Sequence, residues 1–263
     1  MSIQAIARNT FRENIRDRVL YNLILFALIM ILSSIVLGQL SLGHEGKMIV
    51  DLGLTSISVF GTLIAIFLGI SLVYKEMERR TVYALLAKPV RRWEFILGKY
   101  LGLLSTLLVN TIVMTAGLML TLLFQRGVTW EAYGRLLPAV YLIFLSLALT
   151  TALALVFSTF STPALSALFT LFLWVIGHFN ADLIKFAELT GSAGFRWAAR
   201  VLYYALPNIG NFMTLDSRNV IQNAAYARAV DGLAVLGVTL YGLVYCGGLV
   251  ALAALIFSRR DFK

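Results

Sequence analysis

Six long apolar stretches dominate this sequence and leave few folds open to it. A helix needs about 20 apolar residues to cross the roughly 30 Å hydrocarbon core of a bilayer. None of the stretches shows the strict period-2 alternation of a membrane barrel strand. We therefore expect an all-α integral membrane protein, a single domain over residues 1–263, with six transmembrane helices. The expected spans are residues 19–37, 52–73, 97–124, 136–157, 164–179 and 233–257.

The fifth stretch is at or below the usual minimum of about 17 residues for a crossing helix. It either begins earlier, near Ser158, or turns back before it crosses fully. The linker 158–163 carries no charge, so we expect the fourth and fifth spans to form a tight hairpin. In the sixth stretch, four small residues predict close packing against another helix. These are Gly237, Gly242, Gly247 and Gly248.

Composition supports a membrane location. The chain is 60% hydrophobic and 13% charged, whereas a soluble domain is about 45–50% apolar and about 25% charged. The single cysteine, Cys246, lies inside an apolar stretch and is interpreted as a small packing residue. The net charge of +9 does not point to nucleic acid, because no basic stripe with interleaved aromatic residues lies outside the apolar stretches.

The basic residues instead indicate how the chain is oriented. Most of the 22 Lys and Arg residues fall in segments 1–18, 74–100 and 258–263. With six spans, these three segments lie on one side of the membrane. Short cytoplasmic segments are enriched in Lys and Arg, so we expect both termini to be cytoplasmic.

Residues 1–18 predict a helix lying on the inner leaflet. Arg8, Arg12 and Arg16 recur at helical spacing, which would place them among lipid headgroups. A neighbouring apolar row would face the acyl chains. It consists of Ile3, Ala7, Phe11, Ile15 and Val19. The alternative is a basic flank to the first span.

The segment between the second and third spans, residues 75–96, predicts a helical elbow. Glu76, Arg79 and Arg80 have the spacing of helical ion pairs, and Met77, Val82, Leu85 and Leu86 form an apolar side. Pro89 ends this first helix, and a second helix starts by Trp93. The alternative, a solvated loop whose arginines bind lipid, explains the charge but not the apolar patch.

The run ERRTVYALLAKPVRRWEFILGKY (78–100) resembles the signature of type-2 ATP-binding-cassette (ABC) transporter permeases. The similar features are an acidic residue, a Leu-Leu-x-x-Pro, a basic residue and Gly98-Lys99 at the start of the third span. Arg80 stands where the family commonly has glycine. ALPNIGNF (205–212) and FSRRDF (257–262) agree with the same family. The similarity is closest to the six-span permeases of copper-site maturation, sodium export and gliding machinery.

The resemblance implies that the elbow is a cytoplasmic coupling helix that docks on a separate ATPase subunit. An apolar knob flanked by charges can seat in a pocket while ion pairs fix its register. The implied contact set is Glu78, Thr81, Leu85, Leu86, Pro89 and Arg91, with Glu13 and Arg16 as further contacts.

Several partners follow from the same resemblance. They are an ABC ATPase that carries ATP and Mg, a second copy of this chain or a homologous permease, and membrane lipid. The implied location is a bacterial inner (plasma) membrane, and the implied function is ATP-driven export or transmembrane mechanical signalling. A non-transport scaffold that uses the elbow for protein docking is the alternative.

No catalytic constellation is found in the sequence. It has no G-x-x-x-x-G-K-[ST], no H-E-x-x-H and no cysteine pair, so we expect no ATP hydrolysis, metal or cofactor in this chain alone. The spans almost lack the buried charges of a secondary transporter. Among their polar residues, Asn110, Thr111 and Thr115 are candidates for lining a pathway, and hydrogen bonding between helices is the alternative.

The outer segment 180–232 is too long for a simple connection. Residues 195–206 and 216–230 predict helices, and Trp197, Tyr203 and Tyr204 suit a membrane interface. We expect an external cap or re-entrant hairpin that either engages an extracytoplasmic partner or substrate, or packs over the outer leaflet.

Overall fold

The computed structural model describes residues 3–39, 45–78, 91–123, 130–190, 193–215, 218–219 and 232–259. Within these residues the chain is almost entirely helical. The long helices are α1 (Ile3–Ile15), α2 (Arg18–Gln39), α3 (Glu45–Glu78), α5 (Arg92–Leu123), α6 (Trp130–Ser158), α7 (Pro163–His178) and α12 (Gly232–Arg259). The outer segment adds α8 (Asn180–Leu189), α9 (Ala193–Ala205), α10 (Gly210–Met213), β1 (Thr214–Leu215) and β2 (Arg218–Asn219).

The expected all-α membrane fold is confirmed. In the described part of the chain, five helices are long and apolar enough to cross a membrane: Arg18–Gln39, Met48–Ser71, Arg92–Leu123, Leu136–Ser158 and Gly232–Arg259. The fifth expected span, residues 164–179, is α7, an apolar helix of 16 residues that falls below that length. Pro163 begins α7, in the first helical turn where proline costs no hydrogen bond. The expected tight turn therefore joins α6 and α7.

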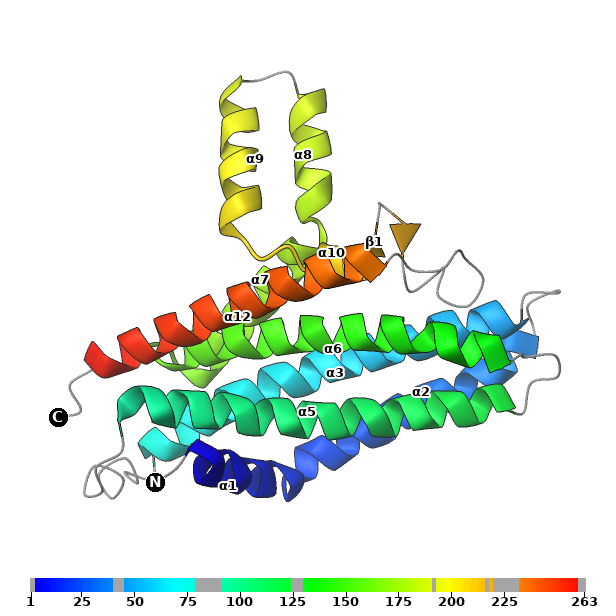
Figure 1. Cartoon of the computed structure of the whole chain (residues 1–263), viewed down its shortest axis with the longest axis horizontal. Coiled ribbons are helices and arrows are strands. Elements are labelled where there is room, and N and C mark those ends of the chain that lie inside the picture. Colours follow the sequence, from blue (N-terminus) through cyan, green and yellow to red (C-terminus); the bar gives the residue numbers. More distant parts are fainter. Residues whose placement is uncertain are drawn as a thin grey trace.

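The bundle is built around α3 and α6. In their most apolar parts, 72% of α3 and 78% of α6 is buried inside the protein, against 22% of α2 and 28% of α12. Helix α3 packs against α2, α5 and α6, whereas α12 lies obliquely across α6 and α5 (Figure 1). The outer helices therefore leave much of their apolar surface for lipid or a partner.

Glycines set the close approach at the centre. An added Cβ at Gly69 would lie 2.7 Å from Ala154 Cβ, and one at Gly61 would lie 2.7 Å from Leu147 Cδ1. Small residues let helix backbones approach in a membrane, where packing rather than water drives association. Helix α3 therefore meets α6 through glycines that the sequence analysis did not single out.

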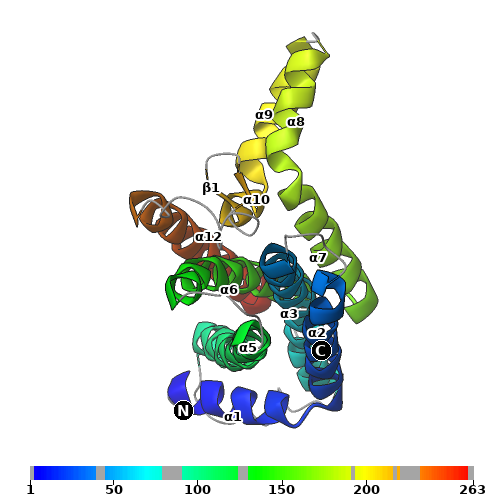
Figure 2. The same cartoon turned by 90° about the vertical axis from the view of Figure 1, so that its right-hand side faces the viewer.

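The outer segment forms a hairpin of α8 and α9 that projects sideways from the bundle (Figures 1 and 2). Helix α9 confirms the predicted helix over 195–206, and α8 was not anticipated. The helix predicted over 216–230 is wrong at Arg218–Asn219, which pair antiparallel with Thr214–Leu215. Asp216 and Ser217 favour turns over helix interiors, which suits this pairing. Residues 216–217 and 220–230 lie outside the described residues.

The ALPNIGNF motif anchors this outer segment to the bundle. The Asn208 backbone N–H donates a hydrogen bond to the Tyr241 hydroxyl of α12 at 2.9 Å. Phe212 is fully buried against Tyr241 and Gly242. The motif therefore fixes where the outer segment returns to α12.

Replacing Gly69 with leucine should destabilise the bundle, because the nearest neighbour is Ala154 Cβ, which has no flexible end to move aside. Overpacking of this kind costs about 1–3 kcal/mol. The measurement is the midpoint of thermal aggregation in detergent, followed by size-exclusion chromatography. Gly237→Leu is the control, since a Cβ there meets nothing within 4 Å. Equal midpoints for both variants would contradict the packing described.

Candidate functional site at the basic end of the bundle

One end of the bundle gathers the elements that flank the elbow. Helix α3 ends there at Glu78, α5 begins at Arg92, and α12 ends at Arg259 (Figure 1). The Arg92 guanidinium joins two of these helix ends, because Nη1 donates hydrogen bonds to the carbonyls of Phe257 at 3.3 Å and Ser258 at 2.8 Å. A cation suits the carbonyl-rich C-terminus of a helix. The start of α5 and the end of α12 are thus held together at the same face.

Helix α1 packs closely against α5 along a seam that contains Gly98 and Gly102. An added Cβ at Gly98 would lie 2.8 Å from Ile6 Cβ, and one at Gly102 would lie 2.6 Å from Thr10 Cβ and 2.7 Å from the Ala7 carbonyl oxygen. The spacing Gly98-x-x-x-Gly102 is the small-x-x-x-small pattern that lets two helix backbones meet. Helix α1 therefore lies against the first turns of α5.

A polar pair extends this seam. Asn14 Nδ2 donates a hydrogen bond to Thr106 Oγ1 at 3.3 Å, and the Thr106 hydroxyl donates to the Gly102 carbonyl at 3.0 Å. Both side chains are buried. An amide in a buried seam requires a partner, so this bond fixes the register of α1 on α5.

The face that α1 buries differs from the expected one. Arg8, Arg12 and Arg16 are exposed, as the interfacial prediction requires. The buried row is Ile6, Thr10 and Asn14, which faces α5 rather than acyl chains. Two polar residues sit in that row because its neighbour is another helix and not lipid. An apolar periodicity alone could not reveal this.

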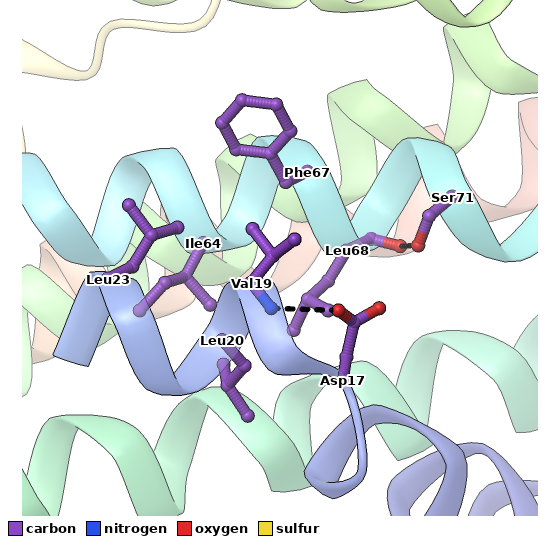
Figure 3. Close-up of a pocket in the computed structure, with 8 residues that line it drawn as sticks. All are labelled: Asp17, Val19, Leu20, Leu23, Ile64, Phe67, Leu68 and Ser71. Atoms are coloured by element: carbon purple, nitrogen blue, oxygen red, sulfur yellow. Dashed lines mark hydrogen bonds between the residues drawn. The ribbon is translucent and has the colours of Figure 1, made fainter. Parts of the chain in front are cut away.

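The turn after α1 contacts α3, the helix that leads into the elbow. Asp17 caps α2, since its Oδ1 accepts a hydrogen bond from the Val19 backbone N–H at 3.0 Å (Figure 3). Beside it, a cavity of about 320 Å³ lies between this turn and the α3 residues Ile64, Phe67, Leu68 and Ser71. The unit of α1, turn and α2 thus spans from α5 to α3, the two helices that flank the elbow.

The family-like pair Gly98-Lys99 lies inside the protein, where both residues make packing contacts. The Lys99 side chain is 2% exposed, and Nζ lies 5.5 Å from the centre of the Phe95 ring. The Phe95 ring stacks on Phe257 with centroids 5.8 Å apart. The stacking of Phe95 on Phe257 ties the start of α5 to α12.

The predicted docking residues fall partly within the described structure. Glu78 ends α3, and Arg91 precedes α5 with an exposed side chain. Glu13 and Arg16 lie at the end of α1 that is level with Thr106, about 20 Å along α5 from Arg91 at 1.5 Å per residue. Thr81, Leu85, Leu86 and Pro89 lie outside the described residues, as does the predicted break in the elbow. The helix that starts by Trp93 is confirmed as α5, and α3 continues past Lys75 to Glu78.

The predicted pathway residues are buried in α5. Asn110 is 5%, Thr111 4% and Thr115 8% exposed. Thr115 Oγ1 donates to the Thr111 carbonyl of its own helix at 2.7 Å, so the hydrogen of that hydroxyl is not available to another helix. Among the described residues, Asn110 Nδ2 finds no hydrogen-bond partner. That these residues line a pathway stays a prediction.

Metal chemistry gains no support from the described residues, among which no group of three or more His, Cys, Asp and Glu is placed to hold a metal ion.

These observations define a polytopic, all-α membrane protein in which the end of α3, the start of α5 and the end of α12 lie at one end of the bundle. The chain belongs to the ABC-2 transporter family: the family model described as "ABC-2 family transporter protein" matches residues 4–262. The match runs from the start of α1 past the end of α12. No match is found among curated proteins. The resemblance to type-2 ABC transporter permeases is therefore confirmed over nearly the whole chain.

Gly102→Ala should loosen α1 from α5, because the new methyl group meets the Ala7 carbonyl and Thr10 Cβ. The expected result is several-fold faster trypsin cleavage in segment 8–18, measured by mass spectrometry of limited digests in detergent. Gly117→Ala on the same helix is the control, since there only the end of the Leu28 side chain must move. Unchanged cleavage in both variants would contradict the seam.

Proposed function

We propose that this permease couples ATP hydrolysis by a separate ABC ATPase subunit to export, or to mechanical signalling across the membrane. The elbow over residues 75–96 is the docking element. The chain itself binds no nucleotide, and ATP and Mg belong to the partner. Two permease chains pair with two ATPase subunits, because each six-span chain offers one elbow.

The observation that carries this proposal is the attachment of both helices beside the elbow. Helix α3 is a central helix of the bundle, and α5 holds α1 through Gly98 and Gly102. A displacement of the elbow by the ATPase is therefore passed to α3 and α5 together, and through α1 to α2. Packed helices move as rigid elements, so a push at one face changes the tilt of the bundle.

The position of the elbow along the bundle axis supports access for a soluble partner. Asp17 and Ser71 line the same cavity, and α3 continues for seven further residues to Glu78. At 1.5 Å per residue this is about 10 Å of helix beyond the α1–α2 turn. The elbow thus extends beyond the level of the α1–α2 turn.

The basic residues at the elbow end of the bundle indicate how the chain is oriented in the membrane. The exposed arginines of α1, Arg91 and Arg259 support assigning this end to the cytoplasmic side of a bacterial inner membrane. The link from Arg92 to the last turn of α12 supports placing both termini there. The α8–α9 hairpin is then external, where it is available to an extracytoplasmic partner.

The double variant Leu85→Asp with Glu78→Arg should abolish docking, because it places charge on the apolar knob and reverses an ion-pair partner. The test is a mild-detergent pull-down of the tagged chain from its native membrane, with mass spectrometry and a vanadate-sensitive ATPase assay. Wild type should co-purify with a nucleotide-binding protein and its activity, and the variant should lose both.

Leu85→Met with Glu78→Asp is the matched control, since it keeps the apolar character of one side chain and the negative charge of the other and should retain the ATPase. If wild type brings down no ATPase and the charged variant changes nothing, the elbow does not couple to ATP, and the scaffold alternative replaces this proposal.

A further inference from the structure

A long apolar groove lies between α5 and α12, on the far side of α5 from α1. Its volume is about 1090 Å³, and its floor is formed by the α6 residues Phe144, Leu145 and Ala148. This exceeds the usual range of about 300–1,000 Å³ for small-molecule sites. Helix α12 reaches this position because it crosses α6 and α5 obliquely (Figure 1).

The groove is open toward the surrounding membrane. Trp93 and Leu101 on one wall are 47% and 40% exposed, and Leu243 and Leu255 on the other are each 60% exposed. At Gly247 an added Cβ would meet nothing within 4 Å, so this position leaves the groove wide. Water would not fill such an apolar trough at membrane depth, whereas acyl chains would.

One end of the groove is basic. Arg91 and Arg92 lie at its mouth on the elbow side, and none of the described residues that line it is acidic. The nearby Glu94 carboxylate accepts a hydrogen bond from the Arg91 backbone N–H at 3.3 Å, as a helix cap. Arginine presents a planar set of donors that matches phosphate. The mouth therefore favours an anionic ligand. A second copy of this chain would bring the same positive charge and would not provide one.

The length of the groove corresponds to one leaflet. From Arg91 to Leu104 its α5 wall rises about 20 Å at 1.5 Å per residue. Half of the hydrocarbon core is about 15 Å, with a headgroup layer of several Å outside it. Phosphate at the arginines and chain ends near Leu104 thus fit a lipid of the leaflet on the elbow side.

We propose that this groove binds one anionic phospholipid of the cytoplasmic leaflet, with its phosphate on Arg91 and Arg92 and its acyl chains between α5 and α12. Basic pockets between transmembrane helices on the cytoplasmic side recognise acidic headgroups in this way. The lipid bridges the first turn after the elbow and the last turns of α12. This site does not depend on the ATPase, and lipid binding is measured without it.

The test is native mass spectrometry of the delipidated, full-length chain in detergent, titrated with phosphatidylglycerol or phosphatidylcholine of identical acyl chains. For wild type we expect the first phosphatidylglycerol to bind about tenfold more tightly than phosphatidylcholine. Gly247→Trp should fill the groove and remove this first binding event. Gly248→Trp is the matched control, because it also meets nothing within 4 Å but does not line the groove, and it should bind as wild type does.

Arg91→Gln keeps the groove and tests the headgroup contact by itself. It should weaken phosphatidylglycerol binding several-fold and leave phosphatidylcholine binding unchanged. Equal affinity of wild type for both lipids would overturn the proposal, as would a Gly247→Trp variant that binds like wild type. A chain whose dimer dissociates on Gly247→Trp, with no lipid bound in either form, would assign the groove to a second copy instead.

Discussion

The close approach of α1 to α5 is the contact on which the arrangement around the elbow depends. Helices in a bilayer gain nothing by hiding apolar surface from each other, because lipid is equally apolar. Their association therefore rests on backbone proximity and on hydrogen bonds. Gly98 and Gly102 supply the first, and Asn14 with Thr106 supplies the second. Since α1 continues through Asp17 into α2, this one seam also positions the contact between α2 and α3.

Few polar side chains of the described spans form hydrogen bonds from one helix to another. Most buried hydroxyls of the described spans donate to carbonyls of their own helix, as do Thr150 to Ser146 and Thr151 to Leu147 at 2.8 Å each. Such bonds satisfy the hydroxyl but hold no two helices together. The bond from Asn14 to Thr106 crosses between helices in the buried interior. Among the span residues, Thr106 forms such a bond with Asn14 of α1, and the Tyr100 hydroxyl of α5 donates to the Ala148 carbonyl of α6 at 3.2 Å.

The long apolar helices could be predicted from the sequence because bilayer thickness fixes their length and polarity. The arrangement of α1 could not, since its buried row contains Thr10 and Asn14, which periodicity of apolar residues does not detect. The spacing Gly98-x-x-x-Gly102 is itself a signal for close helix packing, but the sequence prediction uses Gly98-Lys99 only as a family motif. The burial of Lys99 was also unexpected, because a lysine at the edge of a span normally extends toward the headgroups. Its place over Phe95 depends on α12, which is distant in sequence.

The glycines of α12 show why small residues are ambiguous in a membrane sequence. The sequence predicts close helix packing at four of them. The prediction is confirmed at Gly242, where an added Cβ would lie 3.1 Å from the Phe212 ring. At Gly237, Gly247 and Gly248 an added Cβ would meet no atom of the described residues within 4 Å, so close packing is not seen at these three positions within the described part of the chain. A glycine either admits a neighbouring backbone or leaves room for something outside the chain, and only the position of the next helix separates the two. At Gly247 the second case coincides with the basic mouth and the exposed apolar wall of the groove, which is the arrangement that the proposed lipid site requires.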